Sequence, residues 1–276
     1  MNFKNPELSV LSSKKLYIFD MDGTIYLGAK VFPFAIRFID HLRAAGKQVL
    51  FFTNNASHTP DYYLEKLGRM GFSPKREEIM TSGDVTAAFL LRHRAGKSVY
   101  LVGTPELTEN FHASGISLLT GKEPRADIVV TSFDNTLTYE KLSEACRLIR
   151  GGAEYLSTHP DVTCPTETGS VPDSGAIAAF ITAATGQNPI YFGKPYPETV
   201  EMICETTGCE TGEMAIFGDR LYTDIAIGRR YGITSVLVLS GETKAADVEA
   251  AAPADRPDFL FESLNEADRA LFGISN

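Results

Sequence analysis

Short apolar runs that end at polar or acidic residues constrain the fold of this 276-residue chain most strongly. They cover residues 15–19, 48–52, 214–217 and 235–239. Runs of this length predict buried strands. Helical patterns lie between them, at residues 33–45, 60–70 and 195–207. Each pattern begins with a proline, which suits the first turn of a helix. Strands that alternate with helices predict a mostly parallel α/β sheet.

One interval between the strands is too long for a single crossover. From Asp20 to Thr53 is 33 residues, enough for strand, helix and strand, whereas Thr53 to Lys194 is 141 residues. The long interval has its own alternating pattern, with strands near 98–102, 127–131 and 153–156 and helices at 105–113 and 139–149. We therefore expect a second α/β domain at residues 79–187, inserted into a core formed by residues 1–78 and 188–276.

Charge and composition exclude several classes of protein. The net charge is −9 and no block of Lys and Arg occurs, so we expect no nucleic-acid partner. No apolar run reaches the roughly 18 residues that span a membrane, and the first residues do not resemble a signal peptide. The four cysteines form no CxxC pair, which disfavours zinc. A cytoplasmic protein without a membrane partner is expected.

Polar clusters follow the predicted strands at their carboxyl ends. They are residues 20–24 (DMDGT), 53–55 (TNN), 193–195 (GKP) and 218–224 (GDRLYTD). Ligands of open α/β sheets bind at this edge, so we expect the clusters to share one site. Carboxylates such as Asp20 and Asp219 are typical ligands of a hard divalent cation.

These residue types suit the transfer of a phosphoryl group. A phosphate dianion repels a carboxylate nucleophile such as Asp20, and a bound cation reduces that repulsion. Lys194 can add positive charge. Asp22, two residues beyond Asp20, can protonate the leaving alcohol and later activate water.

Donors at the strand ends can hold the phosphate oxygens. Thr53 and Asn54 have this position, and Gly23 and Asn55 of the same motifs complete the expected substrate-binding set in the core.

In this order, the four motifs resemble those of the haloacid-dehalogenase superfamily of phosphatases. The resemblance implies that Asp20 is the nucleophile and Asp22 the general acid and base. It implies a phosphoryl group bound by Thr53 and Lys194. It also implies a Mg²⁺ ion held by the Asp20 side chain, the Asp22 carbonyl and Asp219, with support from Asp224.

The insert refines the resemblance. Its place after the second motif is that of a C2-type cap, and segments 51–55 (FFTNN), 138–142 (TYEKL) and 159–161 (HPD) resemble the NagD-like class IIA branch. The implied fold is a Rossmann-like three-layer parallel-sheet core with an inserted, smaller α/β cap domain of C2a type. The implied activity is hydrolysis of small phosphomonoesters such as sugar phosphates, nucleoside monophosphates and p-nitrophenyl phosphate.

Substrate selectivity is expected to come from the insert. The loop 157–166 follows an apolar run and is rich in polar residues, so we expect His159 and Asp161 to bind substrate. The family often has Asn where this chain has His159. The expected partner is a small phosphorylated metabolite, and because capped relatives often self-associate, a homo-oligomer is also expected.

Two alternatives remain open. A phosphotransferase or mutase of the same superfamily would also keep Asp22. Mutases usually carry a cap between the first two motifs, however, and the 33-residue gap here leaves no room for one. A non-enzymatic binding protein on the same fold would be indicated by loss of a carboxylate, but Asp20, Asp22, Asp219 and Asp224 are all present.

Overall fold

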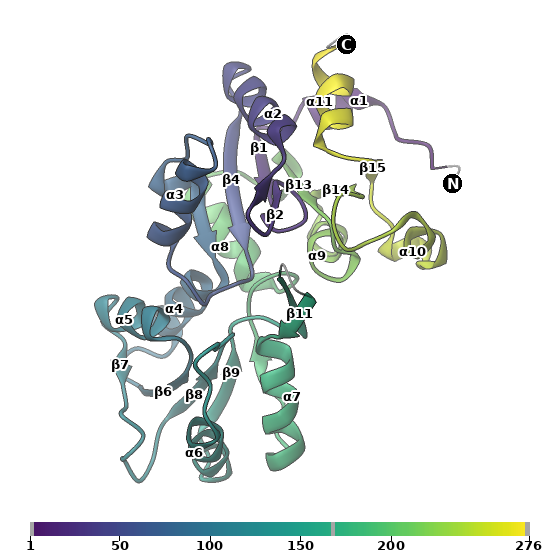
Figure 1. The fold of residues 1–276 in the computed structure, drawn as a ribbon. Helices are drawn as coiled ribbons and strands as arrows, with labels where there is room; N and C mark the ends of the chain where they lie inside the picture. Colours follow the sequence, from purple (N-terminus) through teal and green to yellow (C-terminus); the bar gives the residue numbers. More distant parts are fainter. Residues whose placement is uncertain (1–2, 167–168, 274–276) are drawn as a thin grey trace. The chain divides into compact units, whose positions relative to one another are not determined.

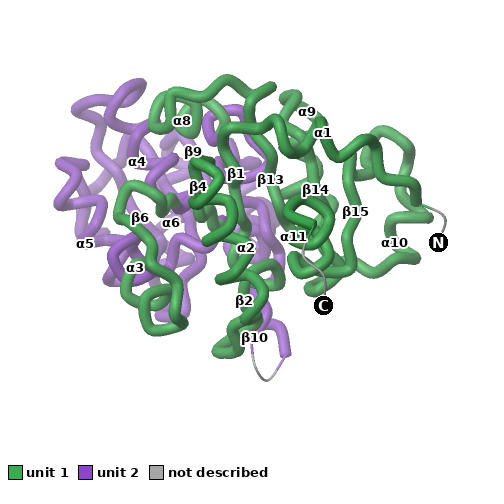
Figure 2. Tube along the Cα trace, turned by 90° about the horizontal axis from the view of Figure 1, so that it is seen from above, with its two compact units in different colours: residues 1–53, 64–80, 200–276 green, residues 54–63, 81–199 purple. Residues whose placement is uncertain are grey.

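The computed structural model describes residues 3–166 and 169–273 (Figure 1). The chain forms two compact units, coloured separately in Figure 2. The first unit contains residues 1–53, 64–80 and 200–276, and the second contains residues 54–63 and 81–199. The boundaries of the inserted domain that we expect from the sequence, 79 and 187, stay a prediction.

A six-stranded sheet forms the centre of the first unit, with strand order β15-β14-β13-β1-β4-β5. Its strands are β1 (Leu16–Phe19), β4 (Gln48–Thr53), β5 (Ile79–Thr81), β13 (Met214–Gly218), β14 (Thr234–Val238) and β15 (Phe259–Phe261). β1 pairs in parallel with β13 and β4, and β14 pairs in parallel with β13 and β15. Four of these strands were predicted from their apolar runs, and β5 and β15 were not.

Aromatic side chains fill the centre of this sheet. Every residue of β1 is buried, as expected for a strand that is covered on both faces. The ring of Phe19 stacks on Phe217 at 5.1 Å and meets the edge of Phe38 at 5.9 Å. These contacts fix β1 against its neighbour β13 and against the helix that follows it.

Helices and short elements complete the first unit. They are α1 (Leu8–Ser12), β2 (Tyr26–Leu27), β3 (Lys30–Val31), α2 (Pro33–Ala44), α3 (Pro60–Arg69), α8 (Pro197–Thr207), α9 (Ala226–Tyr231), α10 (Ala245–Ala250) and α11 (Leu264–Phe272), of which α3 and α8 extend into the second unit. The one-turn helices are η1 (Arg76–Glu78), η2 (Thr211–Glu213), η3 (Leu221–Ile225) and η4 (Pro253–Asp255). The helix expected from Pro195 begins two residues later, at Pro197, because the N–H of Tyr196 closes a turn onto the carbonyl of Gly193.

A second sheet forms the centre of the second unit, with strand order β12-β9-β8-β6-β7. Its strands are β6 (Ser98–Val102), β7 (Ser117–Leu118), β8 (Ile128–Thr131), β9 (Glu154–Ser157) and β12 (Ile190–Tyr191). All four neighbouring pairs are parallel. The helices are α4 (Ser82–His93), α5 (Pro105–Ala113), α6 (Tyr139–Arg150) and α7 (Ser174–Thr185), and β10 (Thr163–Thr166) pairs antiparallel with β11 (Gly169–Pro172).

The predicted fold class is confirmed: a Rossmann-like parallel sheet and a second, smaller parallel α/β sheet. The core of the second unit forms where α6 and α7 pack against its sheet, around Val129, Ile149 and Ile177. Among the described residues, the helices are too short or too polar for any of them to cross a membrane.

Candidate functional site

Three neighbouring strands of the first unit lie side by side, and polar residues follow each of them. Phe19, the last residue of β1, stands opposite Phe217 of β13 and Phe51 of β4, which end one and two residues further on. The N–H of Asp20 donates to the carbonyl of Phe217 at 2.8 Å, which continues the ladder by one residue. Asp219 therefore follows a strand directly beside the one that Asp20 follows.

Three carboxylates gather at these strand ends. Asp20, Asp219 and Asp224 each offer an oxygen that lies within 4.8 Å of the other two. Asp219 and Asp224 are buried, and Asp20 is half-buried. Asp224 lies on η3, a single turn of π-helix, and its carboxylate accepts from the N–H of Arg220 at 3.2 Å. Such turns are frequent at functional sites.

One oxygen of the Asp219 carboxylate could bind a cation. Its Oδ2 accepts from the N–H of Glu242 at 2.7 Å, whereas its Oδ1 is buried and has no hydrogen-bond partner. Burial, followed by the nearby charge of Asp224, raises the pKa of Asp219 to about 7. A buried oxygen without a donor is costly, and a cation between these carboxylates would satisfy it. The residues present therefore fit a hard divalent cation.

Two glycines hold the Asp219 carboxylate in place. A Cβ on Gly23 would stand 2.3 Å from Oδ2 of Asp219, and a Cβ on Gly241 would stand 2.0 Å from the same atom. Gly23 also has a φ of +85°, which residues with side chains rarely adopt. The loop after β1 and the loop after β14 are linked by a hydrogen bond of 2.7 Å from Ser240 Oγ to the carbonyl of Gly23. Gly23 therefore helps to position the carboxylate of Asp219 in the acidic cluster.

Asp22 sits on the loop beyond β1. Burial raises the pKa of its carboxyl, and the ammonium group of Lys66 opposes that shift. The Nζ of Lys66 lies 4.0 Å from the centre of the Tyr26 ring. The backbones of Tyr26 and Asp22 form an isolated β-bridge. A carboxyl whose pKa is raised holds its proton more readily near neutral pH, as a general acid must.

The remaining expected residue of the first unit is Thr53. It is the last residue of β4 and is 6% exposed. The structure therefore groups Asp20, Asp22, Gly23, Thr53, Asp219 and Asp224 at the strand ends of one compact unit.

Asn54 and Lys194 are joined in the second unit. The side-chain Nδ2 of Asn54 donates to the carbonyl of Lys194 at 3.0 Å, and its Oδ1 accepts from the N–H of Lys194 at 2.8 Å. Nδ2 also donates to Oδ2 of Asp161 at 3.0 Å. Lys194 is only 1% exposed. The amide of Asn54 thus fixes the main chain at Lys194.

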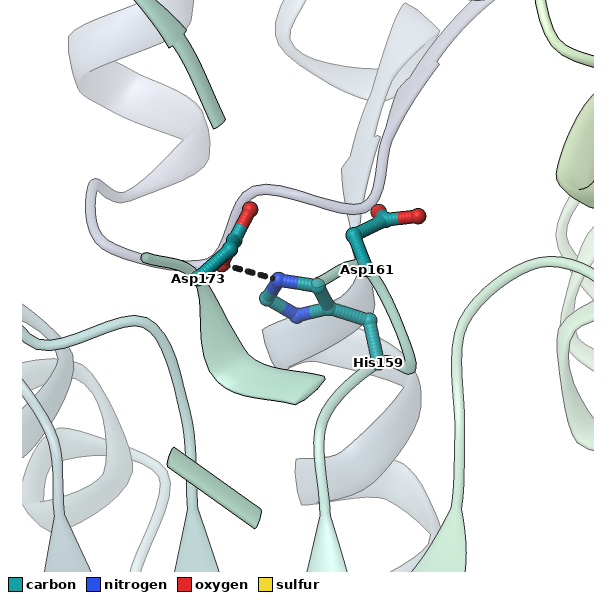
Figure 3. Close-up of side chains that lie close together, drawn as sticks. All are labelled: His159, Asp161 and Asp173. Atoms are coloured by element: carbon teal, nitrogen blue, oxygen red, sulfur yellow. Dashed lines mark hydrogen bonds and ion pairs between the residues drawn. The ribbon is translucent and has the colours of Figure 1, made fainter. Parts of the chain in front are cut away.

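His159 and Asp161 are buried in the second unit. The ring of His159 is 0% exposed, and its Nε2 lies 2.8 Å from Oδ1 of Asp173, as the dashed line in Figure 3 marks. Asp173 is also the N-cap of α7. Both expected substrate-binding side chains therefore contact protein atoms, and their role toward a substrate stays a prediction.

Asn55 closes a local turn. Its Oδ1 accepts from the N–H of Ser57 at 2.9 Å and from the hydroxyl of Ser57 at 2.6 Å. This is the usual arrangement of an Asx turn. A substrate contact by Asn55 stays a prediction.

Two parts of the arrangement were not anticipated from the sequence. The loop after β14 supplies Gly241 and the N–H of Glu242 to Asp219, and Ser82 donates to the carbonyl of Asn54 at 2.5 Å. A glycine two residues after a predicted strand was the available signal for the first part. No sequence signal pointed to Ser82, because its contact joins segments that are 28 residues apart.

Two family models match the chain. One is described as haloacid dehalogenase-like hydrolase and matches residues 17–117. The other is described as HAD-hydrolase-like and matches residues 191–267. Together they cover the segments that carry the four motifs.

Whole-length relatives extend this likeness. An acid sugar phosphatase of Staphylococcus aureus is 36% identical over 253 residues, which are 92% of this chain and 96% of that protein. The crystal structure of a 4-nitrophenylphosphatase from Thermotoga maritima is 42% identical, with a TM-score of 0.89, and the match covers 95% of this chain and 99% of that one.

Two further solved structures are similar. A nagD protein is 39% identical with a TM-score of 0.86, over 93% of this chain and 98% of that one. A glycerol phosphate phosphatase from Mycobacterium tuberculosis, crystallised in complex with magnesium, is 31% identical with a TM-score of 0.86, over 98% of this chain and 78% of that one.

Proposed function

This chain belongs to the haloacid dehalogenase-like hydrolases, in their NagD-like branch, and on that premise we propose that it hydrolyses small phosphomonoesters through a phosphoaspartate on Asp20. The observation that carries the proposal is the cluster of Asp20, Asp219 and Asp224 at adjacent strand ends. The hydrolase class expected from the sequence is confirmed by relatives that are phosphatases of sugar phosphates and of 4-nitrophenyl phosphate.

Magnesium is the cation that we propose for the acidic cluster. The carboxylates of Asp20 and Asp219, with the main-chain carbonyl of Asp22 and support from Asp224, would hold it. When bound, Mg²⁺ would offset the negative charge of the phosphoryl group and the carboxylates. The unpartnered Oδ1 of Asp219 supports this assignment, as does the magnesium complex of the mycobacterial relative.

Asp20 supplies the nucleophile. One of its carboxylate oxygens attacks phosphorus, and the bond from phosphorus to the ester oxygen breaks. The leaving oxygen takes a proton from Asp22, so the alcohol departs neutral. The ionised Asp22 then accepts a proton from water as the water attacks phosphorus, and this step releases inorganic phosphate and restores Asp20.

The raised pKa of Asp22 supports its part in both steps. Burial keeps a proton on the carboxyl for the departing alcohol, and the nearby Lys66 ammonium limits the shift, so the carboxyl can still ionise. Its position two residues after Asp20 places it on the loop and leaves Asp20 at the strand end.

Binding of the phosphoryl group is proposed for Thr53, Asn54, Asn55, Gly23 and Lys194, as their motifs imply. Selectivity among leaving groups is proposed for the inserted domain, expected at residues 79–187. A lid of this kind can exclude water while it covers the leaving group.

We also propose that the protein acts in the cytoplasm on a small phosphorylated metabolite. None of the four cysteines is in a disulfide, as is usual in a reducing compartment; they are Cys146, Cys164, Cys204 and Cys209. Self-association remains part of the proposal, and the molar mass of the protein in solution tests it.

The experiment that tests the function is phosphate release. The purified chain should release inorganic phosphate from p-nitrophenyl phosphate and from members of a panel of sugar phosphates and nucleoside monophosphates, with added Mg²⁺ and not with EDTA. The matched control is Asp20→Asn, which keeps the shape of the side chain and removes the nucleophile. Turnover by a folded Asp20→Asn variant would contradict the mechanism.

A further inference from the structure

Both ring nitrogens of the buried His159 lie within hydrogen-bond distance of polar groups. The hydroxyl of Ser82 gives its hydrogen to the carbonyl of Asn54 at 2.5 Å, and the hydroxyl of Thr158 gives its hydrogen to Ser132 Oγ at 3.0 Å. A hydroxyl has one hydrogen to donate. With their hydrogens placed in this way, both oxygens can accept a hydrogen bond from Nδ1 of His159, at 3.3 and 2.9 Å. A hydrogen on Nδ1 would therefore have an acceptor.

The other ring nitrogen also faces an acceptor. Nε2 of His159 lies 2.8 Å from Oδ1 of Asp173, and the same oxygen accepts from the N–H of Ser174 at 2.6 Å. An ionised carboxylate only accepts hydrogen bonds, so a hydrogen on Nε2 would have an acceptor too. An imidazole with hydrogen on both nitrogens is a cation. In the second unit Asp173 would neutralise such a charge, and Asp161 adds a second carboxylate within 4.8 Å.

The hydrogen bonds continue from the ring to Lys194. Ser82 Oγ lies 3.3 Å from Nδ1 of His159, and its hydroxyl donates to the carbonyl of Asn54. The side chain of Asn54 then binds both main-chain polar groups of Lys194. Asp161 accepts a further hydrogen bond from the amide of Asn54, which fixes the orientation of that amide.

The hydrogen bonds that run from His159 through Ser82 and Asn54 to Lys194 form a path. Strand pairing places the two segments at its ends side by side. Tyr191 of β12 stands opposite Ser157 of β9, and the N–H of Phe192 donates to the carbonyl of Ser157 at 2.9 Å. The segment that leads into Lys194 thus leaves the sheet beside the segment that leads into His159. The whole path lies within one compact unit.

We propose that His159 is a buried imidazolium, paired with Asp173, that positions Lys194 through Ser82 and Asn54. This proposal rests on the proposed function, in which Lys194 binds the phosphoryl group. The phosphoryl group is common to every substrate. A defect in this path therefore weakens binding of all phosphomonoesters by a similar factor and leaves the ranking of substrates unchanged.

The protonation is tested on the wild-type chain with ¹⁵N-labelled histidine. Spectra of the His159 ring, assigned by its loss in His159→Gln, should show two protonated nitrogens from pH 6 to pH 9. A ring with one bare nitrogen at pH 7 would overturn the proposal. That result would also be expected if His159, Asp161 and Asp173 held a metal ion, because a coordinated nitrogen carries no hydrogen.

The positioning role is tested with Ser82→Ala, which removes the link and keeps the pair of His159 and Asp173. Inhibition by inorganic phosphate should weaken by about 3–10-fold, the usual effect of one lost hydrogen bond. The value of kcat/KM should fall by a similar factor for p-nitrophenyl phosphate and for a sugar phosphate. His112→Gln is the matched control, since His112 is exposed on α5 of the same unit.

Three results would decide against the proposal. Unchanged phosphate inhibition in folded Ser82→Ala would overturn the link to Lys194. A changed ranking of substrates in Ser82→Ala or His159→Gln would indicate direct substrate contact instead. A wild-type chain that releases no phosphate would overturn the proposed function, and the role of Lys194 with it, whereas the ring spectrum would still report the protonation of His159.

Discussion

Asp219 lies directly against the main chain of Gly241, so that a side-chain carbon on Gly241 would stand 2.0 Å from Oδ2 of Asp219. The next N–H along the loop, that of Glu242, donates to the same oxygen at 2.7 Å. The loop after β14 therefore fixes one oxygen of Asp219 and leaves the other for a cation. The position of the carboxylate therefore depends on Gly241, which has no side chain that could take part in the reaction.

Gly241→Ala should therefore lower kcat/KM although it replaces no catalytic group. The added carbon must displace the carboxylate, and a misplacement of about 1 Å in an active site can cost roughly 100-fold in rate. We expect a fall of that order in kcat/KM for p-nitrophenyl phosphate and a higher Mg²⁺ requirement. Gly212→Ala is the control, because a Cβ there meets nothing within 4 Å. Equal activity of the two variants would argue against the role of this loop.

Asp22→Asn should affect substrates according to their leaving groups. General acid catalysis contributes about 10²–10⁴-fold, and an activated ester needs it less. The loss in kcat should therefore be larger for an alkyl phosphate, such as a sugar phosphate, than for p-nitrophenyl phosphate. Steady-state rates on both substrates give the comparison. A loss of the same size on both would show that Asp22 does not protonate the leaving oxygen.

Binding of Mg²⁺ should depend on pH through Asp219. The pKa of this carboxyl is about 7 in the metal-free chain, well above its ordinary value, so it is largely protonated below pH 7. A cation needs the ionised form, so binding below that pH releases a proton. The apparent Kd for Mg²⁺ should rise about tenfold for each pH unit below 7 and level off above about pH 8. Calorimetric titrations at several pH values measure this, and Asp219→Asn should abolish the dependence.

Asp268 should stabilise the first unit. Its buried carboxylate accepts from Arg37 Nε at 2.8 Å and lies 2.8 Å from Nδ1 of His41, which joins α11 to α2. Asp268→Ala removes the carboxylate that Arg37 and His41 contact. The free energy of unfolding should therefore fall by about 1–3 kcal/mol. Asp40→Ala is the control, because the exposed Asp40 lies 4.0 Å from Arg43 and such surface pairs contribute about 0–1 kcal/mol. Urea denaturation of both variants should separate them, and equal stabilities would contradict the prediction.

Strands and their terminal acids could be predicted because apolar runs and polar clusters are local in sequence. β6 and α5 have the predicted bounds, and β1, β4, β13 and β14 agree within one residue at either end. Elements without a distinct pattern were missed, among them α7, which is apolar around most of its surface, and β15, which has three residues.

Contacts between segments that are distant in the sequence could not be predicted from it. The sequence indicated Asp219 as a metal ligand, but the contact with Gly241 depends on how two loops fold together. The same holds for His159: its type and position suggested a substrate contact, and only the burial of the ring against Asp173 points to a positioning role.

A phosphoryl group on Asp20 is the central claim, and rapid quenching tests it most directly. Asp22→Asn should slow the attack of water, so during turnover of p-nitrophenyl phosphate the intermediate should accumulate. Mass spectrometry of acid-quenched, proteolysed protein should then find one phosphoryl group on the peptide that contains Asp20, and none when Asp20→Asn is added. Turnover with no phosphorylated peptide, or with the group on another residue, would contradict the account.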